Sequence, residues 1–249
     1  MLKNKLSNKE LTFGSWLTLG SLAVTEIMAK ANFDWLVVDL EHSTISIDLA
    51  GDMIRIIDLC EVTPLVRLTS NDANQIKRVM DAGAGGIVVP MVNCAQEARN
   101  AVEATRYSPN GTRGVGLARA QGYGANFHEY LQWQVNEPVV IVQIEHINAI
   151  EKLEEILTES GVDGFIIGPY DLSCSLGIPG DFDHPDFIDA MKYIHTTSTK
   201  LDKPGGLHIV EPDIAKLKES ISLGYSFIAY SVDFRMLDEA ARNGISSIK

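Results

Sequence analysis

The stretch VVIVQIEHINAIEKLEEIL, residues 139–157, joins an apolar run to a segment with helical spacing. The run VVIVQIE has almost no polar alternation, which is typical of a strand buried on both faces of a parallel sheet. In the segment that follows, four apolar residues fall on one helical face: Ile150, Leu153, Ile156 and Leu157. A buried strand that leads directly into an amphipathic helix is the repeating unit of α/β proteins.

The same unit recurs along the whole chain. Seven other apolar runs are each followed by a longer amphipathic stretch: residues 12–18, 35–40, 64–68, 86–91, 164–168, 206–210 and 227–232. Eight buried strands that alternate with helices within 249 residues predict one domain, residues 1–249, folded as a closed (β/α)8 TIM barrel. No GxGxxG motif follows an early strand, so a dinucleotide-binding fold is the weaker alternative.

The segments between the strands contain two further signals. Glycines end several predicted helices, and we expect Gly83, Gly161 and Gly224 to act as C-caps. The connection 93–138 is much longer than the others, with a predicted helix at 95–106 followed by a Gly- and Arg-rich stretch. A loop of this length predicts a lid, a functional loop or an interface segment.

The composition excludes several classes of protein. The formal net charge of −12 repels phosphate backbones and anionic headgroups, so we expect no nucleic acid and no membrane partner. Three cysteines without a CxxC motif indicate neither a disulfide framework nor a zinc knuckle, and with no signal peptide they predict a cytoplasmic protein. All apolar runs are shorter than the roughly 18 residues of a membrane span.

Polar residues lie at the ends of the predicted strands, where such a barrel has its active site. They are Asp39, Glu41 and His42 after the second strand, Arg67 in the third, Gln143 and Glu145 at the end of the fifth, and Asp171 after the sixth. Buried charges are costly unless they are paired or bound to a metal. This placement therefore predicts a polar site at the mouth of the barrel.

Glu145 and Asp171 follow adjacent strands, so we expect their carboxylates to converge. Two carboxylates, together with water and substrate oxygens, suit Mg2+ or Mn2+. No His or Cys cluster accompanies them, so zinc chemistry of the protease type is not indicated. The alternative is that Glu145 caps the helix that begins near Asn148, while Asp171 caps a turn.

His42 and Arg67 are candidate catalytic residues. His42 follows Asp39 by three positions, and a carboxylate near an imidazole can raise its basicity, as a general base requires. Arg67 lies inside an apolar strand and must meet an anion there, either a substrate enolate or a protein carboxylate. The alternatives are an exposed His42 beside a capping Asp39, and a structural ion pair of Arg67 with Asp39 or Glu145.

The predicted strands carry no lysine at their ends. A Schiff-base aldolase needs a desolvated lysine that points into the barrel mouth. The absence of one, beside two acids, favours metal-dependent stabilisation of an enolate. The turn at Gly168 and Pro169 can also present backbone N–H groups to a substrate carboxylate.

Six stretches of the chain carry a resemblance to a known family. They are FDWLVVDLEHS (33–43), PLVRL (64–68), VVPMVNCAQEA (88–98), RYSPNGTRGVG (106–116), VQIE (142–145) and GPYDLSCSLGIPG (168–180). In this order they resemble the HpcH/HpaI aldolases, which are metal-dependent (class II) pyruvate aldolases of the 4-hydroxy-2-oxoheptanedioate aldolase type. The resemblance implies a barrel of the phosphoenolpyruvate/pyruvate type that reversibly cleaves a 4-hydroxy-2-oxo acid to pyruvate and an aldehyde.

The resemblance also implies roles for individual residues. Glu145 and Asp171 would hold a divalent cation, Mg2+, Mn2+ or Co2+. Arg67 would polarise the pyruvyl carbonyl and stabilise the enolate, while His42, paired with Asp39, would exchange the proton of the 4-hydroxyl group. The substrate site would comprise Arg67, Gln143, Gly168, Pro169, Tyr170 and Asp171.

Relatives of this kind are typically homohexamers, and the resemblance implies that Asp81 contributes to the site of a neighbouring subunit. The loop around Arg113 and Arg119 would lie near the mouth. Tyr170 departs from the small residue of several relatives and would narrow the pyruvate side.

Two other functions stay open from the sequence. Citrate-lyase-like and malyl-CoA-type lyases share this barrel, but they need a basic groove for the CoA phosphates, for which Arg113 and Arg119 are the candidates. A non-catalytic barrel would bind keto acids without turnover.

Overall fold

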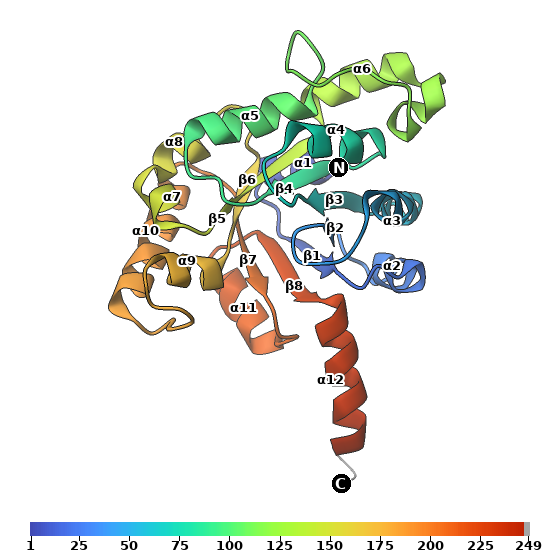
Figure 1. Cartoon of the computed structure of the whole chain (residues 1–249). Helices are drawn as coiled ribbons and strands as arrows, with labels where there is room; N and C mark the ends of the chain where they lie inside the picture. The colour runs from blue at the N-terminus through green and yellow to red at the C-terminus, as the bar shows by residue number, and fades with distance from the viewer. Residues whose placement is uncertain (247–249) are drawn as a thin grey trace.

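Eight parallel strands close into a barrel in the computed structural model, which describes residues 1–246 (Figure 1). The strands follow one another around the barrel in chain order, and β8 pairs with β1. Their bounds are β1 Thr12–Leu17, β2 Trp35–Asp39, β3 Thr63–Arg67, β4 Gly86–Val89, β5 Val139–Ile144, β6 Gly164–Ile167, β7 Gly205–Ile209 and β8 Phe227–Val232. The prediction of a closed (β/α)8 barrel is therefore confirmed.

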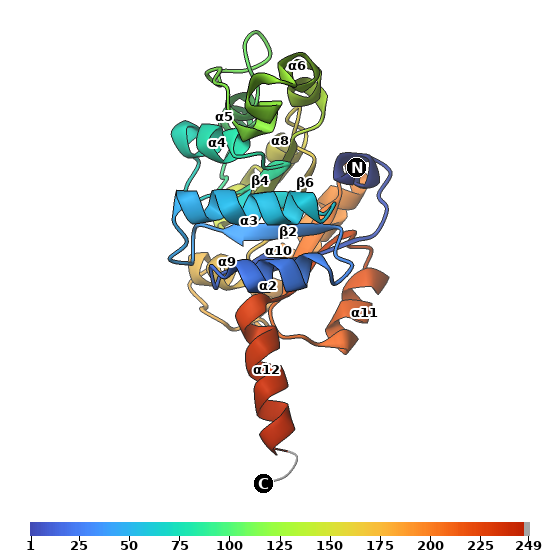
Figure 2. The same cartoon turned by 90° about the vertical axis from the view of Figure 1, so that its right-hand side faces the viewer.

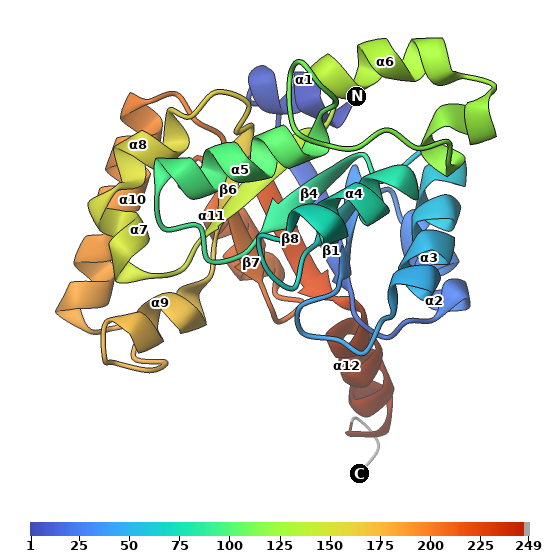
Figure 3. The same cartoon turned by 45° about the horizontal axis from the view of Figure 1, so that its top comes forward.

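Helices surround the barrel on its outer face (Figure 3). They are α1 Leu2–Ser7, α2 Leu22–Ala29, α3 Ile47–Leu59, α4 Ala73–Asp81, α5 Ala95–Thr105, the 3-10 helix η1 Arg119–Gly124, α6 Phe127–Asn136, α7 Ile147–Glu151, α8 Leu153–Leu157, α9 Pro169–Ser175, α10 Pro185–Lys200, α11 Ile214–Ser222 and α12 Asp233–Ser246. Several begin at capping side chains: Asp72 accepts from the backbone of Gln75, for example, at 2.8 Å.

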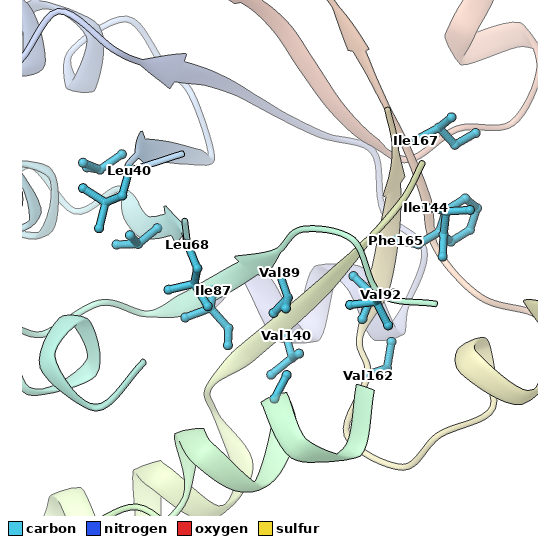
Figure 4. Close-up of a cluster of buried hydrophobic side chains, with 14 of the residues drawn as sticks. Leu40, Leu68, Ile87, Val89, Val92, Val140, Ile144, Val162, Phe165 and Ile167 are labelled. Carbon is cyan, nitrogen blue, oxygen red and sulfur yellow. The ribbon is translucent and has the colours of Figure 1, made fainter. Parts of the chain in front are cut away.

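Side chains alternate along each strand between the barrel interior and the surrounding helices. On β2, Leu36 and Val38 belong to the outer hydrophobic layer beneath the helices, whereas Trp35 and Val37 belong to the inner one. Figure 4 shows part of the outer layer, including Leu40 after this strand. The same alternation turns the residue at the end of β2, Asp39, into the barrel.

The N-terminal end of the barrel is closed by stacked aromatic rings. The ring of Trp35 lies parallel to that of Phe227, with centroids 4.0 Å apart. A Cβ on Gly14 would lie 2.1 Å from the Trp35 ring, so β1 needs glycine at this point. Leu2 and Leu6 of α1 are buried in the same cluster and help to close the barrel interior at this end.

The long connection 93–138 differs from the prediction in two ways. It contains helical structure, η1 and α6, after the predicted helix. It also lies at the N-terminal end of the barrel: Arg119 bonds Asp58 and the carbonyl of Ala82, each at the C-terminal end of a helix that leads into a strand. The expectation that Arg113 and Arg119 lie near the mouth is therefore wrong, because a helix-to-strand connection returns to the strand origins.

Two of the three predicted glycine caps are confirmed. Gly83 and Gly224 have positive φ angles, +100° and +88°, and each stands directly after the C-cap residue of its helix. Gly161 also has a positive φ, but α8 already ends at Leu157 with Thr158 as its C-cap, so this prediction is wrong. The helix predicted after β5 is also interrupted, because Lys152 separates α7 from α8.

The last helix extends away from the barrel (Figures 1 and 2). Its first residue, Asp233, is buried and fixes the helix to the end of β1 by accepting hydrogen bonds from the backbone and hydroxyl of Thr18, at 2.9 and 2.8 Å. Within the described part of the chain, no helix combines the length and apolarity required to cross a membrane.

Candidate active site

A cavity of about 300 Å3 opens at the C-terminal ends of the strands. Its polar lining consists of Thr18, Asp39, His42, Arg67, Gln143, Asp171 and His208. Its other lining residues are Trp16, Ile166, Ile167, Gly168, Pro169, Tyr170, Val210, Val232 and Phe234. Five of the strand-end residues thus line one cavity, in the place where barrels of this kind bind their ligands: Asp39, His42, Arg67, Gln143 and Asp171.

Arg67 and Asp39 form the best-defined pair in this cavity. Their strands lie in register, residue against residue, so both side chains point inward at one level. Arg67 Nε donates to Asp39 Oδ1 at 2.9 Å and its Nη2 donates to Oδ2 at 2.6 Å. The guanidinium also covers the ring of Trp16, 4.3 Å from its centroid. The sequence left open an ion pair of Arg67 with Asp39 or with Glu145, and the structure contains the pair with Asp39.

The predicted pairing of His42 with Asp39 is wrong. Besides Arg67, the Asp39 carboxylate accepts hydrogen bonds from the backbone N–H groups of Glu41 and His42, at 3.0 and 3.3 Å. Asp39 therefore caps the turn after β2, which is the alternative left open by the sequence. The His42 imidazole is largely exposed, and its nearest carboxylate oxygen is Glu41 Oε2 at 3.6 Å.

Glu145 is buried directly after β5, beside the cavity rather than in its lining. Its carboxylate accepts a 2.6 Å hydrogen bond from the backbone of Met91 and another from the side chain of Gln143. Burial raises the pKa of Glu145 despite these two donors. It does not cap the next helix, because that position is taken by His146, whose Nδ1 accepts from the backbone of Asn148 at 3.1 Å.

Asp171 lies in the first turn of α9 and lines the mouth of the cavity, where it is exposed. It does not cap this helix, since Gly168 holds the N-cap position without a side-chain bond. The negative charge of Asp171 contributes to the raised pKa of Glu145, which indicates that the two carboxylates share one electrostatic environment. Gly168, three residues before Asp171, lies against Glu145: a Cβ there would come within 2.7 Å of Glu145 Oε2.

Glu41 is a site residue to which the sequence reasoning gave no role. Burial raises its pKa to about 7, and the charges of Glu145, Asp39 and Asp171 add to this effect while Arg67 opposes it. Its Oε2 atom is buried without a hydrogen-bond partner and lies 3.4 Å from Arg67 Nη1. The sequence offered one indication of such a role: Glu41 lies between Asp39 and His42, two candidate site residues.

Trp16 and His208 also line the cavity, and their ring centroids lie 5.4 Å apart. The sequence places His208 inside the seventh strand, where it could pack in the barrel and needs a hydrogen-bond partner, and this is confirmed; Trp16 was not predicted. Burial lowers the pKa of His208 to about 4, and its Nε2 lies 3.2 Å from the carbonyl oxygen of Ser231. The imidazole is therefore neutral near pH 7. Both residues have the inward parity of their strands.

Asp81 lies at the opposite end of the barrel from this cavity, at the end of α4. It accepts a 2.6 Å bond from the fully buried guanidinium of Arg113. The same guanidinium bonds the hydroxyl of Tyr130 at 2.8 Å and lies over the ring of Tyr107. Within this chain Asp81 is thus remote from the cavity, and the Arg113 side chain is part of a buried network of hydrogen bonds.

The donor set fits a divalent cation held by few protein ligands. Among residues 1–246, no group of three or more His, Cys, Asp or Glu side chains is placed to bind a metal. Glu145 and Asp171 supply two carboxylates, however, and Gln143 Oε1 is buried beside them without a partner. Mg2+ is commonly held by one or two carboxylates together with waters and substrate oxygens.

Comparison with known proteins gives the relationship of the chain. The family described as HpcH/HpaI aldolase/citrate lyase matches residues 12–240. The chain belongs to this family. It is 40% identical over 229 residues to a hydroxypyruvate/pyruvate aldolase of Sagittula stellata, covering 92% of this chain and 89% of the relative. It is 39% identical to a 4-hydroxy-2-oxo-heptane-1,7-dioate aldolase of Shigella sonnei, covering 92% and 87%.

Solved structures of the family agree with the fold. A HpcH/HpaI aldolase/citrate lyase family protein from Burkholderia cenocepacia superposes with a TM-score of 0.93 at 32% identity, covering 99% of this chain and 98% of that one. A HpcH/HpaI aldolase from Desulfitobacterium hafniense gives a TM-score of 0.90 at 30% identity, covering 100% and 96%. As a member of this family the chain is an enzyme, an aldolase of the lyase class.

Proposed function

We propose that this aldolase acts, with a divalent metal, on a 4-hydroxy-2-oxo acid and cleaves it reversibly to pyruvate and an aldehyde. The observation that carries the proposal is that Arg67 and Asp171 line one cavity at the strand ends and that Glu145 is buried beside it. No lysine lines this cavity among the described residues, so its lining offers no Schiff-base nucleophile. The names of the relatives, hydroxypyruvate/pyruvate aldolase and 4-hydroxy-2-oxo-heptane-1,7-dioate aldolase, agree with this chemistry.

Glu145 and Asp171 would hold Mg2+, Mn2+ or Co2+. The bound cation would supply a Lewis acid that polarises the 2-oxo group. Gln143 fixes one oxygen of Glu145, so the carboxylate is already oriented. The raised pKa of Glu145 follows from burial, to which the charge of Asp171 adds, and a bound cation would oppose both effects.

Arg67 would act on the pyruvate half of the substrate. Its guanidinium is held by two bonds to Asp39 and by the ring of Trp16, so it is pre-oriented to face the negative charge that develops on the 2-oxo oxygen. The first turn of α9, through Gly168, Pro169 and Tyr170, would present the backbone N–H groups of Tyr170 and Asp171 to the substrate carboxylate.

His42 would exchange the proton of the 4-hydroxyl group. Removal of this proton allows the C3–C4 bond to break, which releases the aldehyde and leaves the electron pair on the pyruvate half. The imidazole lines the cavity on the side of Arg67 and is close to Glu41, whose carboxylate can receive its second N–H. Glu41, rather than Asp39, would therefore orient the imidazole.

The proposal extends to the assembly. We infer a cytoplasmic, single-domain enzyme that forms a homohexamer, in which Asp81 approaches the site of a neighbouring subunit. Exposed apolar side chains on the protruding α12, such as Leu237, support burial against another copy. A CoA-dependent lyase is disfavoured, because Arg113 is buried and Arg119 is paired at the far end of the barrel.

A pyruvate-release assay tests the proposal. The protein would be treated with a chelator, then reconstituted with Mg2+, Mn2+ or Co2+ and supplied with a 4-hydroxy-2-oxo acid. Activity should require the metal and should fall by on the order of 100-fold or more in Arg67→Ala. Full activity after chelation and in Arg67→Ala would contradict the scheme, and pyruvate binding without any turnover would support a binding protein instead.

A further inference from the structure

The backbone of Met91 adopts a conformation that residues of its type rarely take. Met91 lies in the loop between β4 and α5, two positions after Val89, and its φ angle is +52°. In this left-handed region the side chain crowds the following carbonyl oxygen, which costs free energy for every residue except glycine. Within this chain the Met91 side chain is 45% exposed, so its packing does not offset that cost. The contacts of the Met91 backbone therefore hold the conformation.

Both polar groups of the Met91 backbone are bonded. Its N–H donates to Glu145 Oε1 at 2.6 Å, and its carbonyl oxygen accepts from Asn93 Nδ2 at 2.9 Å. The residues on either side, Pro90 and Val92, are buried, and Val92 packs in the outer hydrophobic layer (Figure 4). With both neighbours fixed, rotation of Met91 out of the left-handed region would break one of these two hydrogen bonds. Conformations of this kind persist where the surrounding structure holds them, and they cluster at functional sites.

The loop that contains Met91 is also anchored to the following helix. The backbone N–H of Asn93 donates at 2.6 Å to Oε2 of Glu97, which lies in the first turn of α5. Buried residues of the barrel thus fix one end of the loop, and a side chain of α5 fixes the other. The direction of the Met91 N–H is therefore set by contacts within one chain.

The Glu145 carboxylate is restrained from three directions. Met91 N–H donates to Oε1, Gln143 Nε2 donates to Oε2, and Gly168 lies so close that a Cβ there would come within 2.7 Å of Oε2. Glu145 is 3% exposed, so these groups rather than bulk water set its orientation. A carboxylate has about four lone-pair positions, so each oxygen keeps one position free beyond the bond that it accepts. A cation would bind at these remaining positions.

We propose that Met91 is a positioning residue for the metal ligand Glu145: its left-handed backbone aims one N–H at Oε1 and thereby directs the free lone pairs of the carboxylate toward the cation. The inference rests on the proposed metal site and adds a residue that orients one of its two ligands. Partners that orient a metal ligand commonly contribute roughly 10- to 100-fold to metal affinity. Because a backbone group makes the contact, residue 91 acts through its tolerance of the left-handed region and not through its side chain.

An isomeric pair of variants tests this role. Met91→Leu and Met91→Ile place the same atoms at residue 91, but the branched Cβ of Ile opposes the left-handed region far more strongly. Mn2+ would be titrated calorimetrically into the chelator-treated full-length protein. The affinity should stay within about threefold of the wild type in Met91→Leu and should fall by roughly tenfold or more in Met91→Ile. A neighbouring subunit that covers residue 91 would meet the same apolar volume in both, so equal affinities in the two variants would overturn the inference.

A second pair separates the backbone of residue 91 from its side chain. Leu preserves the apolar side chain, whereas Asn gives it up but adopts the left-handed region more readily. Met91→Asn should therefore bind Mn2+ at least as tightly as Met91→Leu, and it should unfold at a higher temperature in the metal-free protein. Weaker binding or a lower Tm in Met91→Asn than in Met91→Leu would contradict the role of the backbone, and this comparison stands even if Met91→Ile fails to fold.

Two further readouts separate this inference from the function on which it rests. Exchange of the pyruvate methyl protons into D2O, followed by NMR, reports enolate formation without any aldehyde. At saturating Mn2+ the exchange rate of Met91→Ile should return to within about threefold of the wild type, because the loss lies in metal affinity. A rate that stays low would show that Met91 acts on the substrate instead. Absence of Mn2+ binding by the wild type would refute both the metal site and the inference, whereas wild-type binding with equal affinities in Met91→Leu and Met91→Ile would refute the inference alone.

Discussion

Arg67 and Asp39 bind each other through two parallel hydrogen bonds, Nε to Oδ1 at 2.9 Å and Nη2 to Oδ2 at 2.6 Å. Asp39 is 1% exposed, and the same carboxylate also holds the turn that carries Glu41 and His42. The buried Asp39 carboxylate thus orients the Arg67 guanidinium and also fixes the turn after β2.

Removal of that acid should therefore cost both stability and activity. We expect Asp39→Ala to lower the free energy of unfolding by about 3–5 kcal/mol, because it leaves the Arg67 guanidinium partly buried without its partner. Asp52→Ala is the matched control, since Asp52 forms an ion pair with Arg55 in which both side chains are about half exposed, and it should change the stability by less than about 1 kcal/mol. Chemical denaturation measures both; equal losses would show that burial of the pair is unimportant.

His42 should matter for one half-reaction only. His42→Ala should slow aldol cleavage by on the order of 100-fold, since the hydroxyl loses its base, while exchange of the pyruvate methyl protons changes far less. Pyruvate release and NMR exchange compare the two steps in one preparation. His128→Ala, on the exposed face of α6, is the control and should leave both rates unchanged. An equal loss of both rates in His42→Ala would argue against a role at the hydroxyl group.

Glu41 should make stability depend on pH in the metal-free protein. Its pKa is raised to about 7 from an ordinary value of 4.5, so the folded state binds a proton more tightly than the unfolded state. Its contribution to stability is thus present below pH 4.5 and is lost as the pH rises toward 7. The free energy of unfolding of Glu41→Gln, relative to that of the wild type, should increase by about 2 kcal/mol between pH 5 and pH 8.

Denaturation of the chelator-treated wild type and Glu41→Gln at these two pH values measures the difference. Glu61→Gln, an exposed acid outside the cavity, provides the control and should follow the wild type at both pH values. A constant difference between Glu41→Gln and the wild type would show that Glu41 titrates normally.

Arg113 should stabilise the fold without taking part in CoA binding. Arg113→Ala leaves Asp81 without its partner and Tyr130 without its hydrogen bond, so we expect a loss of about 3–5 kcal/mol in unfolding free energy. Arg99→Ala, which removes a half-exposed partner of Glu159, should cost less than about 1 kcal/mol. Thermal and denaturant unfolding report both, and a small effect in Arg113→Ala would mean that its buried network is not structural.

The barrel was predictable because its signal is repeated. Each strand is an apolar run, and the structure moves the predicted ends by no more than two residues, as at β4, which ends at Val89 rather than Met91. The strand ends also placed Asp39, Arg67 and Gln143 around one cavity, since residues of the same parity point inward together.

Other features depend on contacts between distant segments. His42 follows Asp39 by three positions, but a bidentate partner on the next strand, Arg67, takes the carboxylate that the imidazole was expected to use. The position of the Arg113 loop depends on which end of the barrel a connection serves. The raised pKa of Glu41 depends on burial and on acids that include two from other segments, Glu145 and Asp171. The spacing of residues along the chain does not predict such contacts between distant segments.

The central claim is that Glu145 and Asp171 together hold a divalent cation at this cavity. Isothermal titration of Mn2+ into the chelator-treated full-length protein tests it most directly, with Asp171→Asn, Glu145→Gln and the surface variant Asp186→Asn measured in parallel. We predict one site per chain in the wild type and Asp186→Asn, with affinity weakened at least tenfold in each of the other two variants. Wild-type affinity in both Asp171→Asn and Glu145→Gln would contradict the claim.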